Sequence, residues 1–155
     1  MVLEIDRQGG RTKPVQLIQV SKLTGISKRY LEQLAIALKS HSLIRGISGR
    51  KGGYLLARSP KKITIGDVLK AVIGPIDLSV CVVEPESCMR AEFCECRLIW
   101  TLLNRKVNAV LEEFSIADLS DKTLMKEIRD QLLGEEERNP IMAEGEAPSI
   151  TGGDC

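Results

Sequence analysis

Four cysteines lie within sixteen residues of one another, and they are the residues best suited to chemistry in this chain. The six, five and one residues between them differ from the Cys-x-x-Cys pairs that are usual in zinc fingers. Thiolates from one loop can instead hold an iron–sulfur cluster, which requires only that the sulfur atoms converge. The candidate ligands are Cys81, Cys88, Cys94 and Cys96, and the candidate cofactor is a 2Fe-2S or 4Fe-4S cluster.

Other interpretations of these cysteines remain open. The thiols can bind zinc, form a reversible disulfide switch, above all between Cys94 and Cys96, or serve as small buried apolar side chains. A thiol redox or metal-carrier protein that uses Cys94-Glu95-Cys96 is the rival function. Brown colour after anaerobic purification would indicate a cluster, whereas a colourless protein with titratable thiols would indicate the rival. Cys155, far along an acidic tail, is expected to be an exposed free thiol.

Charge is distributed unevenly along the chain. Residues 1–62 carry 13 Lys and Arg against 3 Asp and Glu, whereas residues 63–155 carry 9 against 18, so a net charge of +1 hides halves of +10 and −9. The basic half has an electrostatic reason to bind a polyanion such as double-stranded DNA. Aromatic residues make up only 3% of the chain, so the core must be aliphatic, and helical spacing of those residues favours a mainly α protein.

Two short helices are predicted on either side of Gly25. The first spans 15–23, with Val15, Ile18 and Leu23 on its apolar face. The second spans about 28–40, begins after a potential Ser27 cap, and places apolar residues at three- and four-residue steps. This is the helix-turn-helix pattern. The polar residues at the start of its second helix are the candidate DNA contacts: Lys28, Arg29, Tyr30 and Gln33. A solvated helix surface is the alternative for this pair taken alone.

A glycine-rich hairpin follows the two helices. Two β-type runs, 43–47 and 53–57, flank a tip that carries Arg50 and Lys51. A narrow basic hairpin of this kind can follow the DNA backbone or enter the minor groove while a helix occupies the major groove. Helix pair, basic wing and charge together favour DNA binding.

A long amphipathic helix is predicted over 97–114. Leu103, Val107, Val110 and Phe114 recur at helical steps, and Trp100 precedes them. So long an apolar stripe requires a partner, and a second copy of the chain is the simplest one. A further short helix is expected over 119–133, followed by a disordered acidic tail.

The expected fold is therefore mainly α with a small β wing. It comprises a winged helix-turn-helix over 1–75 whose first helix looks truncated, a cysteine-rich loop over 76–97, a dimerisation helix with a short following helix over 98–133, and the tail over 134–155. No signal peptide or membrane-spanning run is visible, so we expect a cytoplasmic protein with no membrane partner. No set of catalytic residues emerges, so no enzymatic activity is expected.

Four segments resemble the Rrf2 family of bacterial winged helix-turn-helix transcription regulators. They are GISKRYLEQL (25–34), GRKGGYLLAR (49–58), ITIGDVLKAVIGP (63–75) and CVVEPESCMRAEFCECRLIW (81–100). The resemblance covers about residues 1–120. It implies a homodimer on a roughly palindromic operator, a cluster held by Cys81, Cys88 and Cys94 of one protomer, and recognition contacts at Arg29 and Glu32.

The chain departs from the family's pattern at its short first helix and at two further positions. Some members have a ligand histidine three residues after the third cysteine, where this chain has Arg97. The fourth ligand is therefore open, with Cys96 the nearest candidate and a carboxylate from the part of the first helix that looks missing from this chain the other. Ser48 stands where some members have a wing arginine, so Arg50 would take that role. The expected function is a DNA-binding regulator whose operator affinity depends on an iron–sulfur cluster or on the redox state of the cysteine loop.

Overall fold

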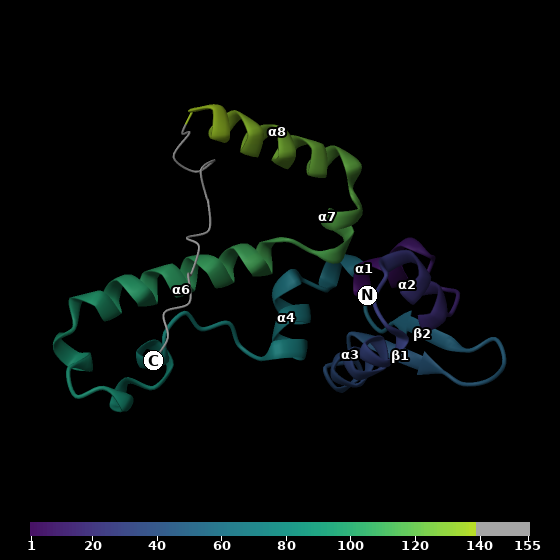
Figure 1. Ribbon diagram of the computed structural model, residues 1–155, viewed down its shortest axis with the longest axis horizontal. Coiled ribbons are helices and arrows are strands. Elements are labelled where there is room, and N and C mark those ends of the chain that lie inside the picture. The colour runs from purple at the N-terminus through teal and green to yellow at the C-terminus, as the bar shows by residue number, and fades with distance from the viewer. Residues whose placement is uncertain (139–155) are drawn as a thin grey trace, which may run out of the picture. The chain divides into compact units, whose positions relative to one another are not determined.

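The computed structural model describes residues 1–138 and divides the chain into two units, Met1–Ser120 and Asp121–Cys155. Figure 1 labels the longer helices and the two strands, and the first unit contains most of the elements. In chain order they are α1 (Val2–Arg7), α2 (Leu17–Thr24), α3 (Lys28–Ser40), β1 (Ile44–Ile47), β2 (Gly53–Leu56), a 3-10 turn (Pro60–Lys62), α4 (Ile65–Ile73), α5 (Val80–Val83), two 3-10 turns (Pro85–Ser87 and Ala91–Phe93), α6 (Glu95–Glu113) and α7 (Ile116–Ser120). The predicted class, mainly α with a small β wing, is confirmed.

Helices α2 and α3 form the helix-turn-helix. Gly25 ends α2 with a φ of 71°, in the left-handed region that favours glycine. Two residues later the Ser27 hydroxyl accepts a hydrogen bond from the Tyr30 amide at 3.3 Å and caps α3. The predicted cap is thus confirmed. It sets the start of α3 at Lys28, the first of its polar residues.

Strands β1 and β2 pair antiparallel, with Ile44 opposite Leu56 and Ile47 opposite Gly53. Val15 joins the other edge of β2 through two backbone hydrogen bonds with Tyr54, of 2.9 and 2.8 Å. The prediction that Val15 begins a helix is therefore wrong, because its backbone extends the small sheet and α2 starts only at Leu17.

The apolar face predicted for the first of these helices is also partly wrong. Leu17 and Val20 are its buried residues, whereas Ile18 and Leu23 are 45% and 65% exposed. The apolar residues of this short helix fit two faces almost equally well, and only the packing against α3 selects one of them.

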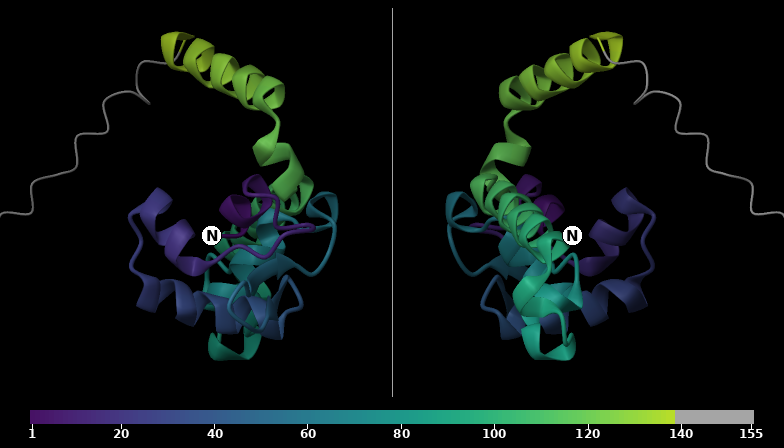
Figure 2. Two further views of the ribbon diagram at one scale, coloured as in Figure 1. Left: turned by 90° about the vertical axis from the view of Figure 1, so that its right-hand side faces the viewer. Right: turned by 90° about the vertical axis from the view of Figure 1, so that its left-hand side faces the viewer.

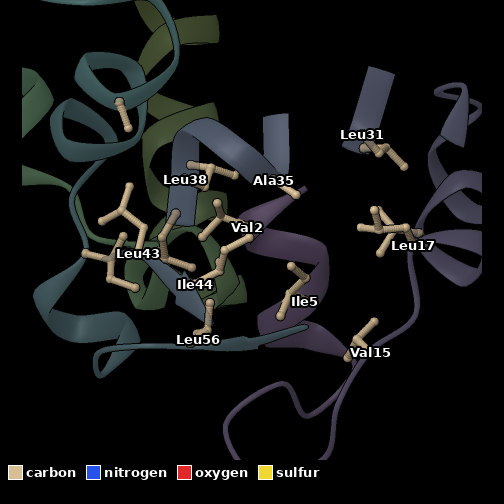
Figure 3. Close-up of a cluster of buried hydrophobic side chains, with 14 residues drawn as sticks. Val2, Ile5, Val15, Leu17, Leu31, Ala35, Leu38, Leu43, Ile44 and Leu56 are labelled. Carbon is tan, nitrogen blue, oxygen red and sulfur yellow. The ribbon is translucent and has the colours of Figure 1, made fainter. Parts of the chain in front are cut away.

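The core lies where α1, α3 and the strands meet. Leu31, Ala35 and Leu38 form the buried stripe of α3, and Val2 and Ile5 of α1 are buried with them. Figure 3 shows these side chains together with Leu43, Ile44 and Leu56 from the hairpin. The short first helix is therefore an integral part of the core.

Two connections join the winged region to the segment that follows α6. The amide of Ile65 donates to the carbonyl of Phe114 at 2.9 Å, and the amide of Ile116 donates to that of Ile63 at 2.8 Å. Elsewhere α1 packs against α7 (Figure 2), and the Ser120 hydroxyl donates to buried Asp6 at 3.3 Å. The far end of α6 is thus fixed to the winged region of the chain.

The second unit contains α8 (Lys122–Arg138), whose first amides, of Thr123 and Leu124, donate to Asp121 at 2.8 and 3.3 Å. We expected one short helix over 119–133, but the chain forms α7 and α8 with a break between them. Helix α8 also continues past Gly134, where the disordered tail was expected to begin. The expectations for 139–155, Cys155 included, lie outside the described residues. Within residues 1–138 no helix combines the length and hydropathy needed to cross a bilayer.

Candidate nucleic-acid interface and cysteine loop

The candidate DNA-contacting residues of α3 all lie on its exposed side. Leu31, Ala35 and Leu38 face the core, so the positions between them point to solvent. The exposed candidates are Lys28, Arg29, Tyr30, Glu32 and Gln33. Lys28 and Glu32 form an ion pair of 3.3 Å with side chains 58% and 52% exposed. An exposed pair of this kind is weak, so both groups remain available to another partner.

A groove of about 360 Å³ separates the start of α3 from the wing. Gln16, Leu17 and Ile18 form one part of it, and Lys28 and Glu32 contribute from α3. Gly52, Gly53 and Tyr54 line the wing side. The fold therefore places two of the predicted α3 residues in the same groove as the start of β2, next to the tip of the hairpin, although they are about twenty residues apart in sequence.

Glycine at position 52 determines the shape of the wing. Its amide donates to the carbonyl of Gly49 at 2.9 Å, and a Cβ there would overlap the backbone oxygen of Ile47. This close turn leaves Arg50 and Lys51 exposed at the tip. Neither residue forms an ion pair within the described part of the chain, so the tip carries two uncompensated positive charges.

The four clustered cysteines occupy more ordered positions than the predicted loop. Cys81 lies in α5, Cys88 follows a 3-10 turn, Cys94 precedes α6 as its N-cap, and Cys96 lies in the first turn of α6. All four are free thiols, with Cys88 and Cys96 exposed and the other two half-buried. The prediction of an irregular segment over 81–96 is therefore wrong at both ends, where short helical turns form.

The donor set fits an iron–sulfur cluster in its chemistry but not in its present geometry. Four accessible thiols on one segment are the soft ligands that such clusters require. Among the described residues, however, no three Cys, His, Asp or Glu side chains form a group that could hold a metal ion. The structure thus places the predicted ligands on one segment without bringing their sulfur atoms together.

Arg97 has a role that the sequence did not indicate. Its Nε donates to the carbonyl of Cys81 at 2.9 Å, and its Nη1 donates to the carbonyl of Ala91 at 3.2 Å. The residue at the position of the family's ligand histidine therefore fastens two distant points of the cysteine segment to α6. A charged donor that bonds two carbonyls is a comparatively strong link.

Two asparagines fasten the beginning of the same segment. Asn104 accepts from the Leu78 amide and donates to Asp77, both at 3.2 Å, while Asn108 donates to the carbonyl of Ile76 at 3.0 Å. These contacts span 26, 27 and 32 residues of sequence. We call Arg97, Asn104 and Asn108 the α6 latch. Their spacing of seven and four, which places all three on one face of a helix, was the available sequence signal.

Another face of α6 is apolar and exposed. Leu103, Val107 and Val110 are 40%, 37% and 52% exposed, and Ile99 and Trp100 are exposed nearer the start of the helix. We call Leu103, Val107 and Val110 the α6 seam. An apolar stripe that lies exposed along one face of a helix is unusual on an isolated chain and is typical of an interaction surface.

The helix-turn-helix, the basic wing and the groove between them define a winged-helix DNA-binding regulator. The sequence profile of the Rrf2 family, described as iron-dependent transcriptional regulators, matches residues 1–122. The chain therefore belongs to the Rrf2 family. This family is not enzymatic, which agrees with the expectation that the chain has no enzymatic activity.

Individual relatives agree with this assignment. The transcriptional regulator IscR of Sodalis glossinidius is 32% identical over 118 residues, which cover 76% of this chain and 71% of the relative. Among solved structures, CymR, the global cysteine regulator of B. subtilis, matches with a TM-score of 0.62 and 29% identity over 76% of this chain and 85% of CymR. IscR of T. potens matches with a TM-score of 0.60 and 26% identity over 76% of each chain.

Proposed function

We propose that this transcription regulator binds DNA as a homodimer and that the state of its cysteine segment sets its operator affinity. In this proposal Cys81, Cys88 and Cys94 hold an iron–sulfur cluster, with Cys96 as the candidate fourth ligand. The observation that carries the proposal is that the thiols lie on a segment fastened by the α6 latch to the helix that bears the α6 seam.

The DNA-contacting set follows from exposure, charge and position. Arg29 and Glu32 read base edges, because guanidinium and carboxylate groups pair with distinct donor and acceptor patterns in the major groove. Lys28, Tyr30 and Gln33 support them from the same exposed turns, and the wing residues Arg50 and Lys51 contact the adjacent backbone or minor groove. The groove between α3 and the wing supports this arrangement, because residues of both elements line it and a DNA duplex could contact both.

The coupling between cysteine segment and DNA runs through α6. A bound cluster would supply a link between thiolates that responds to oxidation, iron and small ligands. Drawing Cys81 and Cys94 together would act on Arg97, which bonds the carbonyl of Cys81 and lies in the first turn of α6. Because the far end of α6 is hydrogen-bonded to the start of α4, a shift of α6 alters how two winged regions are held in a dimer.

A disulfide switch is the second candidate for the cysteine segment. One observation favours it: all four thiols are free, Cys88 and Cys96 are exposed, and a disulfide needs only two of them. The iron–sulfur cluster and the disulfide would both act on the cysteine segment and through the α6 latch. They differ in whether a cofactor is bound, not in how the change would affect DNA binding. The metal-carrier alternative has no comparable support, because Cys94 and Cys96 are built into the start of α6.

An anaerobic reconstitution with iron and sulfide tests the proposal. We expect a brown protein whose affinity for a duplex selected from a random pool differs at least about tenfold between cluster-loaded and cluster-free forms, equivalent to about 1.4 kcal/mol. Cys88→Ala should lose the visible absorbance, whereas Cys155→Ala should keep it. Cys96→Ala identifies the fourth ligand by a lost or shifted spectrum.

Two results would count against the cluster. Full iron and sulfide binding by Cys88→Ala would remove the segment from the cofactor assignment. A colourless wild type whose DNA affinity changes when its thiols are oxidised, and recovers with a reductant, would replace the cluster by the disulfide switch.

A further inference from the structure

Three arginines surround a cavity at the base of the wing. The cavity measures about 470 Å³ and is separate from the groove beside α3, since the two share no lining residue. It is lined by Arg11, Arg45, Leu56, Ala57, Arg58, Ser59 and Pro60. No carboxylate is among these residues, so the cavity presents positive charge and hydrogen-bond donors.

Two of the arginines form ion pairs with carboxylates that do not line the cavity. Asp6, whose side chain is only 3% exposed, accepts from the Nε of Arg11 at 2.9 Å, and this bond raises the pKa of Arg11. Asp67 lies 3.5 Å from Arg58. Each carboxylate is itself fixed, Asp6 by Ser120 and Asp67 by its place in the cap of α4. The guanidinium groups are thereby held in position with some donors still unused.

Arg45 is the third arginine, and its charge is uncompensated. It lies exposed on β1 and forms no ion pair or side-chain hydrogen bond within residues 1–138. Three guanidinium groups around one cavity repel one another, and the two carboxylates offset only part of that repulsion. A multiply charged anion in the cavity would relieve the remainder.

We propose that Arg11, Arg45 and Arg58 form a phosphate-binding site, which takes either a backbone phosphate of DNA or a free phosphate group. Guanidinium groups match the oxygens of a tetrahedral phosphate in pairs, and the Ser59 hydroxyl adds a neutral donor. A free phosphate group, which carries up to two negative charges, suits three arginines better than a single carboxylate does, and a backbone phosphate of DNA supplies one charge with the same arrangement of oxygens. This site is distinct from the cysteine segment and does not depend on it.

The position of Arg45 allows the DNA source. It precedes the tip residue Arg50 by five residues, which at roughly 3.3 Å per extended residue span at most about 17 Å, because β1 ends at Ile47 and the chain then turns. Half a helical turn of DNA has about that length. A duplex bound at the wing tip therefore has further phosphates at the distance of this cavity.

Arg45→Ala is the variant that tests the site. Its side chain is exposed and its backbone pairing with Leu55 does not depend on it, whereas Arg11→Ala would leave buried Asp6 without its ion pair. Arg45→Lys keeps the charge but loses the paired donors. Arg129→Ala, an exposed arginine of α8, is the matched control.

Two measurements distinguish the sources. Titration calorimetry with inorganic phosphate at constant ionic strength reports a free-anion site, and we expect Arg45→Ala to weaken binding at least about tenfold, with Arg45→Lys between it and wild type. The salt dependence of binding to a 30-base-pair duplex of arbitrary sequence reports a DNA phosphate, for which Arg45→Ala should lower the slope of log K against log salt by about one.

The outcomes separate clearly. Loss of phosphate binding with an unchanged slope assigns the site to a free phosphate, and a reduced slope assigns it to the DNA backbone. If wild type binds no phosphate and Arg45→Ala has the same slope as Arg129→Ala, the proposal is overturned.

Discussion

Single charged side chains in this chain differ in what holds them in place. Lys28 is paired with Glu32 on the surface of α3, Arg97 is bonded to two backbone carbonyls, and Arg29 forms no ion pair among the described residues. A side chain without partners can reach a base edge with no bond to break first. We therefore propose Arg29 as the α3 residue that recognises a base, and the wing charges as contacts to the DNA backbone.

Removing Arg29 should change DNA binding in a different way from removing the wing residues Arg50 and Lys51. Arg29→Ala is expected to cost about 1–3 kcal/mol at one base position and to relax preference there, because a specific base contact is lost. The double change Arg50→Ala and Lys51→Ala should weaken binding to all sequences and flatten its salt dependence. Salt titrations against selected and scrambled duplexes measure both effects. Wild-type binding by both variants would contradict the assigned interface.

Arg97 offers a prediction that is independent of any cofactor. Removing its two bonds with Arg97→Gln should loosen the start of the cysteine segment and raise the rate at which a thiol reagent modifies Cys81. We expect about a tenfold increase, equivalent to about 1.4 kcal/mol of local stability. Mass spectrometry of the labelled peptides reads each cysteine separately. Arg90→Gln, an exposed arginine in the same segment, is the control, and equal rates in the two variants would remove the latch role.

Sequence reasoning found the positions of the charged residues more readily than their contacts. The exposed side of α3 followed from the spacing of Leu31, Ala35 and Leu38, because helical period alone separates inside from outside. Arg97 was visible only as a departure from the family's pattern. Its partners are 16 and 6 residues away and are backbone oxygens, which carry no signature in the sequence.

At the level of elements, α6 has two faces of different character. Each residue turns a helix by about 100°, so Arg97, Asn104 and Asn108 lie within about 40° of one another. By the same geometry the α6 seam is centred roughly 110° away. One face therefore binds the cysteine segment of its own chain and leaves the apolar face uncovered.

The asparagine contacts can be measured one amide at a time. Asn104→Ala removes the acceptor of the Leu78 amide, which should then exchange its hydrogen about tenfold faster, in keeping with a hydrogen bond worth about 1 kcal/mol or slightly more. Amides of α3 should keep their protection, since they belong to the core. Arg105→Ala, an exposed change on the same helix, provides the comparison. Unchanged exchange at Leu78 would show that the contact does not hold the segment.

The ends of the helices and strands show where the spacing of apolar residues alone does not predict the structure. The long helix over 97–114 was predicted almost at its true limits, because nineteen residues of consistent spacing are hard to mistake. The short elements were less predictable. Val15 entered the sheet through a bond with Tyr54, 39 positions later in the chain, and the break at Asp121 arose from a side-chain cap rather than from any loss of apolar residues.

At the scale of the whole molecule, the basic winged region and the long helix are coupled through backbone rather than through charge. The paired bonds between the start of α4 and the end of α6 leave little freedom between recognition helix and seam within residues 1–120. The charge asymmetry, which the sequence already displayed, supports the proposal that DNA binds to the winged region. The coupling could not be read from the sequence, because it joins residues about fifty positions apart.

The α6 seam leads to the last prediction, which concerns assembly. Val107→Asp and Val110→Asp should each leave the folded chain intact, because both side chains are already exposed on it. In a dimer the same aspartate would be an unpaired buried charge that costs several kcal/mol, so the dissociation constant should rise at least about a hundredfold. Operator affinity should fall with it, since two half-sites would no longer be bound together. Sedimentation measures the assembly directly, and Ala109→Asp, which places the same charge on a different exposed face of α6, controls for the substitution itself. Variants that remain dimeric at the concentrations where wild type does would place the dimer contact elsewhere than on this face of α6.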